Sequence, residues 1–514
     1  MTSMRVAEGH AFHGLTRNVE SPGRGSAEPL GLQLKGDMIE APIAVSGNIE
    51  RLVLITHREP FAVQQRDEGV VVERSVGGLI AALEPAMRQT RGVWVSIAPK
   101  KLADQTRIDD VLQQLPYEWL PVTLDDDIRD NSYLCFSNGA LWPLYHSLLG
   151  DAVYHRHHWQ AYMQANTSFA DIAAPTLRAN DLVWVHDYQL SLLPALLRKR
   201  GLPRETRIGF FLHVPFPPFD LFRTLPWAEK IIDGMLGASL IGFHVAEYVQ
   251  NFLECVEQIK GLRCDRMRGR VLVDDRWVQV RAIPIGIDSR QYVDGLTDPR
   301  VQERAIALRA EIGAEKIIVG VDRLDFTKGI CERLRALDAF FERYPERQGQ
   351  VSLVQIAVPS RIELPTYKAL REEIERLVGH INGRYARPGW TPITYMFRSL
   401  PFEELLPLYL AADVALVTPL RDGMNLVAKE FVAAHRERCG VLILSELAGA
   451  AQQLTEAILV NPYDVDAIAD AIERALLMPA DQQTRRLRAM NIKVERYDVS
   501  HWIEAFLAEA LYAE

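Results

Sequence analysis

The sequence predicts an α/β protein with two doubly wound parallel sheets. Short apolar runs rich in Val, Ile and Leu recur along the chain, and amphipathic helical patterns separate them. The 514 residues suffice for about two to four domains. Polar or charged residues follow most of the apolar runs, at the strand ends where open α/β sheets bind ligands. We therefore expect two similar domains, each with polar residues gathered at one edge of its sheet.

Composition and charge exclude several classes of protein. Hydrophobic residues make up 48% and charged residues 24%, as in ordinary globular proteins, so a mostly disordered or fibrous chain is not expected. There are 58 Lys and Arg against 67 Asp and Glu, a net charge of −9, so nucleic acid is not an expected partner. No run of about 18 apolar residues is present, so a membrane is not expected either.

Cysteine usage bears on the compartment. The five cysteines are widely spaced and form no C-x-x-C pair, which argues against a disulfide framework and a zinc knuckle. This pattern suits the reducing cytoplasm, where we expect the protein to be located.

The domain organisation follows from where the periodic patterns begin and end. Residues 1–48 mix Gly, Pro, Ser and charged residues without periodicity, so we expect a poorly ordered N-terminal extension. The first sheet domain is expected over residues 49–287 and the second over 288–490. Residues 491–514 carry an apolar helical face, which we expect to pack back toward the first domain.

Polar residues at the strand ends of the first domain are candidate ligand contacts. Arg58, Asp187 and His213 each follow an apolar run, and the Gly77-Gly78 pair stands before a helical pattern, where backbone N–H groups can approach a phosphate or sugar. A Gly-Gly pair is more often only a turn. The expected strands are 51–56, 182–185, 208–212, 240–243 and 280–284.

Residues 131–146 read NSYLCFSNGALWPLYH, a segment interrupted by Asn, Gly and Pro. We expect an irregular loop here and no regular helix. The exposed faces of Tyr133 and Trp142 would suit stacking on a sugar ring, although aromatic side chains more often belong to the core.

No cluster in the sequence predicts a metal site. His155, His157 and His158 would scatter over different faces of a helix, so we interpret them as a solvated helix surface. Asp125 and Asp127 form a D-x-D pattern that we interpret as a solvated acidic turn.

The second domain carries cations at its first two strand ends. Arg323 and Lys328 follow the first strand and precede a helix, and Arg361 follows the second strand. Two fixed positive charges beside backbone donors are what a departing diphosphate needs. The expected strands are 316–321, 351–357, 394–397, 412–418, 441–444 and 458–460.

The stretch 416–430, LVTPLRDGMNLVAKE, predicts a strand, a loop and a helix that begins near Leu426. The loop directs unpaired backbone N–H groups at one space, and Glu430 lies about one helical turn further on, where a carboxylate can accept from a ribose diol. No G-x-G-x-x-G follows a strand, so a nicotinamide dehydrogenase is not expected. The candidate ligand contacts in this stretch are Asp422, Gly423, Met424, Asn425, Leu426 and Glu430.

Taken together, these motifs resemble those of a known family. They are HREP with SVGGL, FSNGALWPLYH, VWVHDYQL, GFFLHVPFP, VDRLDFTKG, QIAVPSR, INGRY, GWTPI, TPLRDGMNLVAKE, LSELAGAA and NPYD. From about residue 50 to its end, the sequence resembles the retaining glycosyltransferases of the trehalose-6-phosphate synthase family, glycosyltransferase family 20. The resemblance implies a GT-B fold, in which two Rossmann-like domains face each other across a cleft.

The resemblance also implies an activity and roles for individual residues. The implied reaction moves glucose from UDP-glucose to glucose 6-phosphate with retention, without a cofactor or a metal, and we expect a homo-oligomer, either a dimer or a tetramer. The implied catalytic residues are Arg323, Lys328, His213, Asp187 and Asp422. The implied donor-binding residues are Gly78, Gly423, Met424, Asn425, Leu426 and Glu430. The implied acceptor-binding residues are Arg58, Tyr133, Trp142, Asp187 and Arg361.

Two alternatives remain open at the level of the sequence. The first strand ends in THREP, whereas many members of the family have S-N-R or A-N-R there, and a His before the Arg also resembles glucosylglycerol-phosphate synthases, which use glycerol 3-phosphate. The other alternative is a catalytically silent relative that binds a sugar phosphate or nucleotide as a signal. The intact Arg323, Lys328, Asp422 and Glu430 argue against a silent protein.

Overall fold

The structure is a computed structural model. It describes residues 50–66, 69–74, 83–84, 87–88, 90–98, 117–203, 205–436 and 438–513. The expected N-terminal extension, residues 1–48, and Gly78 with its Gly-Gly pair lie outside the described residues.

The first sheet has nine strands, and seven of them run parallel. All five strands expected in this part of the chain are confirmed. The strands, in their order across the sheet, are β5 (Glu118–Val122), β4 (Val93–Ile97), β1 (Arg51–Ile55), β6 (Asp181–His186), β7 (Arg207–Phe211), β8 (Leu240–Phe243), β11 (Arg276–Ala282), β10 (Arg270–Val273) and β9 (Cys264–Asp265). A separate antiparallel hairpin joins β2 (Phe61–Arg66) and β3 (Gly69–Arg74).

The second sheet has six strands, all parallel. All six expected strands are confirmed. In their order across the sheet they are β14 (Ile393–Met396), β13 (Val351–Val358), β12 (Lys316–Arg323), β15 (Val414–Val417), β16 (Val441–Ser445) and β17 (Ile458–Val460).

Both sheets share one winding pattern. The first strand of each sheet lies inside it: β1 lies between β4 and β6, and β12 lies between β13 and β15. The chain therefore winds outward in one direction and then in the other, as in doubly wound Rossmann-like folds. This arrangement confirms the predicted fold class. It also creates a switch point beside β1 and another beside β12, where ligands bind at the carboxyl ends of the strands.

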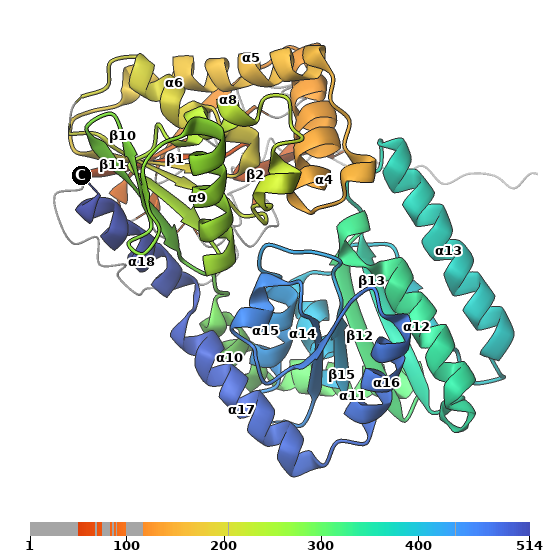
Figure 1. The fold of residues 1–514 in the computed structure, drawn as a ribbon. Helices are drawn as coiled ribbons and strands as arrows, with labels where there is room; N and C mark the ends of the chain where they lie inside the picture. The colour runs from red at the N-terminus through yellow and green to blue at the C-terminus, as the bar shows by residue number, and fades with distance from the viewer. Residues whose placement is uncertain are drawn as a thin grey trace, which may run out of the picture. The chain divides into compact units, whose positions relative to one another are not determined.

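Helices cover both faces of the sheets (Figure 1). The helices around the first sheet are α3 (Asp126–Asp130), α4 (Trp142–Tyr145), α5 (Arg156–Ala173), α6 (Leu193–Lys199), α7 (Phe219–Phe222), α8 (Ala228–Met235) and α9 (Ala246–Lys260). Those that follow are α10 (Ser289–Thr297), α11 (Pro299–Ile312), α12 (Ile330–Arg343), α13 (Pro365–Tyr385), α14 (Phe402–Ala411), α15 (Leu426–Ala434), α16 (Val465–Leu476), α17 (Ala480–Arg496) and α18 (Val499–Tyr512).

The last helix, α18, contacts the first sheet, although the helix before it contacts the second domain. Whereas α17 contacts α15, the following helix α18 packs on β7 and β8 of the first sheet. The ring of Phe506 lies so close to Gly209 that a Cβ there would come within 2.6 Å of it. The domain bounds 49–287, 288–490 and 491–514 stay predictions, and residue 491 falls inside α17.

Residues 131–141 form a π-helix, so the expectation of an irregular loop was wrong. The Ser137 hydroxyl donates to the carbonyl of Ser132 at 2.8 Å, and the Asn138 amide donates to the carbonyl of Tyr133 at 2.8 Å. Both bonds reach back five residues, the spacing of a π-helix, so polar side chains stabilise the wide turn. Trp142 begins α4 and is 5% exposed, so its face is not presented to solvent.

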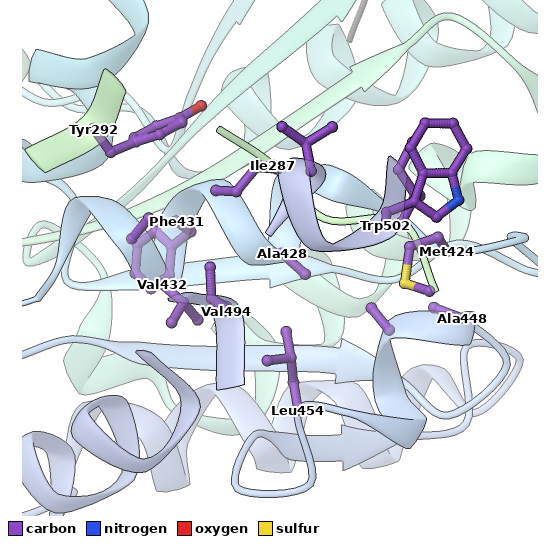
Figure 2. Close-up of a cluster of buried hydrophobic side chains, with 14 of the residues drawn as sticks. Ile287, Tyr292, Met424, Ala428, Phe431, Val432, Ala448, Leu454, Val494 and Trp502 are labelled. Atoms are coloured by element: carbon purple, nitrogen blue, oxygen red, sulfur yellow. The ribbon is translucent and has the colours of Figure 1, made fainter. Parts of the chain in front are cut away.

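One hydrophobic cluster connects the two sheets. It includes Leu52 and Trp184 from one face of the first sheet and Val319 from one face of the second sheet. Figure 2 shows the part of this cluster in which Trp502 of α18 and Met424 lie near one another. Because one apolar cluster is shared, the two Rossmann-like domains are stabilised together.

Two chain crossings between the sheets meet at Gly286. A Cβ on Gly286 would lie 2.2 Å from the carbonyl oxygen of Tyr497, so only glycine allows this approach. Beside it, the Lys429 ammonium from α15 donates to the carbonyl oxygen of Ile285 at 2.6 Å. The Lys429 side chain is buried, and burial lowers its pKa from 10.5 to about 7.

We expect Lys429 to make unfolding depend on pH in the alkaline range. Between pH 7 and 10.5 the unfolded chain keeps a proton at this residue that the folded chain has lost, so stability rises with pH by at most about 1.4 kcal/mol per unit. Below that window both states are charged and the contribution is constant. Urea unfolding of the wild type and of Lys429→Met between pH 7 and 10.5 measures this pH dependence, because only the wild type has the titrating lysine at this position. A difference in stability that stays constant with pH would contradict it.

Candidate functional site

The loop after β15 is shaped by Asn425. This residue has a positive φ of 75° and is the N-cap of α15, and its side chain accepts from the Ala428 N–H at 3.2 Å. Its amide also donates to Asp422 at 3.1 Å. The helix begins at Leu426 as predicted.

Four consecutive backbone N–H groups of this loop are available to a ligand. In the part of the chain that the structure describes, those of Gly423, Met424, Asn425 and Leu426 donate to no protein acceptor. They stand at the N-terminus of a helix, where the helix dipole also favours negative charge. The loop therefore forms a binding site for an anion such as a phosphate.

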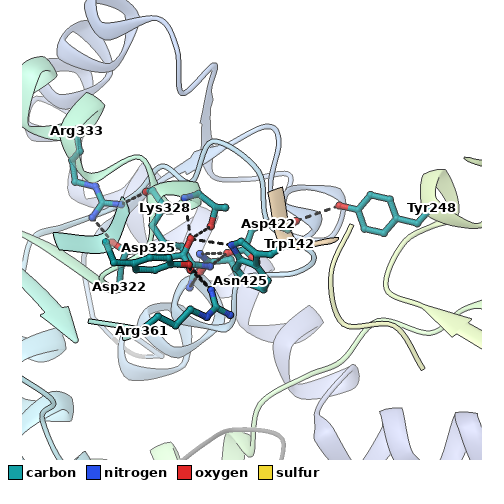
Figure 3. A network of polar contacts seen from close by, with 12 residues as sticks. Trp142, Tyr248, Asp322, Asp325, Lys328, Arg333, Arg361, Asp422 and Asn425 are labelled. Atoms are coloured by element: carbon teal, nitrogen blue, oxygen red, sulfur yellow. Dashed lines mark hydrogen bonds and ion pairs between the residues drawn. The ribbon is translucent and has the colours of Figure 1, made fainter. Parts of the chain in front are cut away.

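Lys328 and Asp422 meet at the second switch point. Lys328 follows β12 and Asp422 follows β15, and their side chains form an ion pair with an N–O distance of 2.5 Å (Figure 3). Burial by itself would raise the pKa of Asp422, but Lys328 lowers it below its ordinary value. Lys328 is thus a fixed cation beside the free amides of the loop.

Glu430 lies further along α15 and is half-buried. The Tyr409 hydroxyl donates to its carboxylate at 2.8 Å, and burial raises the pKa of Glu430. One carboxylate oxygen is therefore engaged by Tyr409, and the other can accept from a ligand hydroxyl.

Asp187 and His213 meet at the first switch point. The Asp187 carboxylate accepts from the backbone N–H of His213 at 3.3 Å and from that of Tyr188 at 3.0 Å. Asp187 has a positive φ of 72°, which is strained for a residue other than glycine. Burial raises the pKa of Asp187 to about 6, although Arg58 acts against the rise. Arg58 itself is exposed.

Tyr133 lies among arginines from both domains. Burial would raise the pKa of Tyr133, but three neighbouring guanidinium groups outweigh burial and lower it. These are Arg58, Arg361 and Arg323. Tyr133 also stacks on the ring of His57, with centroids 4.6 Å apart. Three positive charges therefore surround the phenol of Tyr133. Such a cluster can bind the phosphate group of a sugar phosphate.

A buried carboxylate, Asp325, connects the two domains. It accepts from the indole N–H of Trp142 at 3.2 Å and from the Arg361 guanidinium at 2.9 Å (Figure 3). It also accepts from the Tyr367 hydroxyl at 3.0 Å. Burial by itself would raise the pKa of Asp325, but Arg361 and other cations lower it to about 2. The Arg361 guanidinium also lies 4.4 Å from the centroid of Trp142. Asp325 thereby fixes the two side chains expected at the acceptor.

These contacts do not use all the hydrogen-bond donors of Arg361. Its Nη2 donates to the Tyr188 hydroxyl at 3.3 Å, but its Nε is buried and has no hydrogen-bond partner among the described residues. Arg323 lies over the same indole, with its guanidinium 5.5 Å from the centroid of Trp142. A ligand anion near Trp142 would therefore meet two guanidinium groups.

The predicted site residues divide into two groups that the structure brings close together. The second-domain group is Arg323, Lys328, Asp422, Gly423, Met424, Asn425, Leu426 and Glu430, and the other group is Arg58, Tyr133, Trp142, Asp187, His213 and Arg361. Direct bonds join the domains, since the Tyr248 hydroxyl donates to the carbonyl of Asp422 at 3.2 Å. Asp325 and Tyr188 belong to this site and were missed, although both stand within motifs of the sequence. Each stands two residues past the end of a buried strand, and a polar residue at that place is the signal that could have found them.

The three neighbouring histidines do gather, contrary to the expectation that they scatter. The rings of His157 and His158 lie 4.0 Å apart, and His155 precedes α5 as its N-cap, so helical spacing does not apply to it. Among the described residues no group of His, Cys, Asp and Glu could hold a metal ion. Over the same residues, none of the helices has both the length and the apolarity to cross a bilayer.

Gly423 provides a close approach between the two domains. A Cβ at Gly423 would lie 2.2 Å from the carbonyl oxygen of His213, so Gly423→Ala forces the loop away. We expect this to cost about 1–3 kcal/mol of stability. Gly379, in α13, has no atom within 4 Å of an added Cβ, so Gly379→Ala serves as the control and should leave stability unchanged or slightly higher. Urea unfolding of the two variants checks this, and equal stabilities would contradict the close contact.

The chain is similar to proteins named trehalose-6-phosphate synthase. A Mycobacterium leprae protein named trehalose-6-phosphate synthase is 42% identical over 467 residues, which cover 88% of this chain and 93% of that protein. A Dictyostelium discoideum protein named alpha,alpha-trehalose-phosphate synthase [UDP-forming] A is 40% identical over 462 residues. The match covers 89% of this chain but only 62% of the Dictyostelium protein.

Solved structures share the fold. The trehalose-6-phosphate synthase of E. coli bound with UDP-2-fluoro glucose has a TM-score of 0.79 and 33% identity, covering 90% of this chain and 99% of that one. A Burkholderia xenovorans alpha,alpha-trehalose-phosphate synthase (UDP-forming) in complex with glucose-6-phosphate has a TM-score of 0.79 and 32% identity, with the same coverage. The family model of glycosyltransferase family 20 matches residues 50–512. The chain therefore belongs to glycosyltransferase family 20.

Proposed function

We propose that the chain transfers glucose from UDP-glucose to the anomeric oxygen of glucose 6-phosphate, giving α,α-trehalose 6-phosphate and UDP with the donor configuration retained. The observation that supports this most directly is the pairing of two anion sites. One is Lys328 with the free amides of the loop after β15, and the other is the arginine cluster around Tyr133. A nucleotide sugar and a sugar phosphate would each supply one anion.

In the proposed donor site, the pyrophosphate lies at the N-terminus of α15. Arg323 and Lys328 neutralise it, Gly423 to Leu426 donate backbone N–H groups, and Glu430 accepts from the ribose hydroxyls. Lys328 can keep its bond to Asp422 and still contact the phosphate, because an ammonium has three donors. We assign Gly78 to the phosphate side of the donor on the family resemblance alone.

In the proposed acceptor site, Arg361 and Arg58 bind the phosphate. Tyr133 and Trp142 lie beside the sugar ring. The Nε of Arg361, which has no partner in the described part of the chain, is a donor that a phosphate oxygen can accept from. Asp187 and His213 lie between the two sites and contact the sugars. His57, the histidine of THREP, stacks on Tyr133 and so lies behind the side chain that faces the acceptor ring.

The chemistry proposed for this site needs charge stabilisation and no protein nucleophile. As the bond from the anomeric carbon to the phosphate oxygen breaks, positive charge grows on the sugar and negative charge grows on the departing phosphate. Arg323, Lys328 and the loop amides stabilise the phosphate, and the acceptor hydroxyl attacks from the same face and gives its proton to a departing phosphate oxygen. Because these groups supply the positive charge, we propose that the reaction needs no metal.

UDP release from UDP-glucose tests the function, with glucose 6-phosphate or glycerol 3-phosphate as acceptor and with products identified by mass. We expect trehalose 6-phosphate, formed only with the hexose phosphate. Turnover with glycerol 3-phosphate alone would assign the chain to the glucosylglycerol-phosphate synthases. Tight UDP binding without transfer to either acceptor would indicate a regulatory protein.

We further propose that the protein works in the cytoplasm as a homo-oligomer, either a dimer or a tetramer. The five cysteines are free thiols, which supports a reducing compartment. Sedimentation analysis of the purified protein tests the oligomeric state.

A further inference from the structure

His186 is a buried residue at the end of β6 that the proposed mechanism does not use. Its ring is 1% exposed, and its Nδ1 lies 3.0 Å from Nε2 of His213. His213 is half-buried, and its other ring nitrogen, Nδ1, has no hydrogen-bond partner among the described residues. His186 therefore contacts His213 on the side away from the nitrogen that a ligand can reach.

The two rings can share only one proton in this contact. Burial lowers the pKa of His186 well below 6.5 and that of His213 to about 3, so both rings are neutral near neutral pH. Each neutral ring then has one N–H and one acceptor nitrogen. Either His186 donates through Nδ1 and His213 carries its proton on Nδ1, or His213 donates through Nε2 and its Nδ1 is bare.

The surroundings of His186 distinguish these arrangements. Its Nε2 is buried without a hydrogen-bond partner among the described residues, and so are the indole nitrogens of Trp184 and Trp502. The centroid of Trp184 lies 4.7 Å from that of His186 and 5.0 Å from that of Trp502. An indole N–H can only donate. A bare Nε2 is the one acceptor among these three buried atoms, whereas a protonated Nε2 would add a third buried donor without an acceptor.

We propose that His186 is a positioning residue that holds His213 with its proton on Nδ1, so that His213 presents an N–H donor to a sugar oxygen of the bound substrate. The sugar contact rests on the proposed function, whereas the protonation of the free protein does not. Trp502 connects the His186–His213 pair to the C-terminal helix α18, because its ring centroid lies 5.9 Å from that of His213.

The protonation is measured directly in the ligand-free full chain. Nitrogen NMR of protein labelled with ¹⁵N-histidine distinguishes a protonated Nδ1 from a protonated Nε2, and the spectrum of His213→Gln identifies the His213 signals. We expect hydrogen on Nδ1 of His213. Hydrogen on Nε2 of His213 would overturn the proposal. This readout stands even where the wild type transfers no glucose, so it is independent of the proposed function.

Kinetics of two variants test the positioning role. His186→Asn keeps an N–H donor on the atom bonded to Cγ, whereas His186→Phe keeps the ring and its stacking without a donor. We expect His186→Phe to lower kcat/KM for UDP-glucose about tenfold, and His186→Asn to stay within about threefold of the wild type. Equal losses in the two variants, or no loss in His186→Phe, would overturn it. Circular dichroism and urea unfolding confirm that both variants fold.

Discussion

Replacing Lys328 by methionine is expected to lower kcat by about 10²–10³-fold. Methionine preserves much of the aliphatic length of lysine but removes the charge that faces the departing phosphate. The loss is increased by Asp422, whose carboxylate lies 2.5 Å from the Lys328 ammonium. Without that cation, an unpaired carboxylate would stand beside a diphosphate and repel it.

A steady-state assay of UDP release measures this effect, and a double variant separates its two causes. Lys328→Met/Asp422→Asn lacks both the cation and the repelling carboxylate, so it should bind UDP more tightly than Lys328→Met alone. Lys368→Met is a matched control, because Lys368 is exposed on α13, and it should keep the wild-type rate. A wild-type kcat in Lys328→Met would remove Lys328 from the proposed mechanism.

The strands of this protein are readable from sequence because most of them are buried on both faces. Strands such as β1 and β16 are fully buried and read as continuous apolar runs. The strand β5 was missed because it lies at the edge of its sheet, where Glu118 and Pro121 are tolerated in an otherwise apolar segment. Its neighbour β4 is an ordinary buried strand, and nothing in its composition explains why it was missed.

The π-helix at 131–141 could not be predicted from the composition of the segment. Asn and Gly in this segment indicated a loop, because such residues usually interrupt a helix. The structure instead uses Ser137 and Asn138 as donors to carbonyl groups five residues back. Such bonds depend on the exact conformation of the turn, so composition alone does not reveal them.

The site was predictable as a set of positions but not as a set of contacts. Sequence placed Arg323, Lys328 and Asp422 after strands, which parallel sheets bring to one edge. Pairing Lys328 with Asp422 requires that β15 lie beside β12, and that strand order is a property of the whole sheet. Asp325 looked like one more charged residue of a loop, because its partners come from distant segments.

Removing the Asp325 carboxylate is expected to have the largest effect on stability. Asp325→Ala leaves the guanidinium of Arg361 buried without its counter-charge, which costs about 3–5 kcal/mol. Asp325→Asn still accepts from Trp142 and should cost less, about 1–3 kcal/mol. Asp338→Ala removes an ion pair with Arg384 near the surface of α12 and should cost under about 1 kcal/mol.

The pH dependence of these variants identifies the charge as the cause. The folded-state pKa of Asp325 is about 2, below its ordinary value of 3.8, so its contribution is fully present above the ordinary value and is lost as the pH falls toward 2. The difference in unfolding free energy between the wild type and Asp325→Asn should therefore shrink below about pH 4. Because Asp325 also fixes Trp142 and Arg361, Asp325→Asn should raise KM for glucose 6-phosphate more than KM for UDP-glucose. Equal rises in both KM values would show that Asp325 supports the whole site and not the acceptor side in particular.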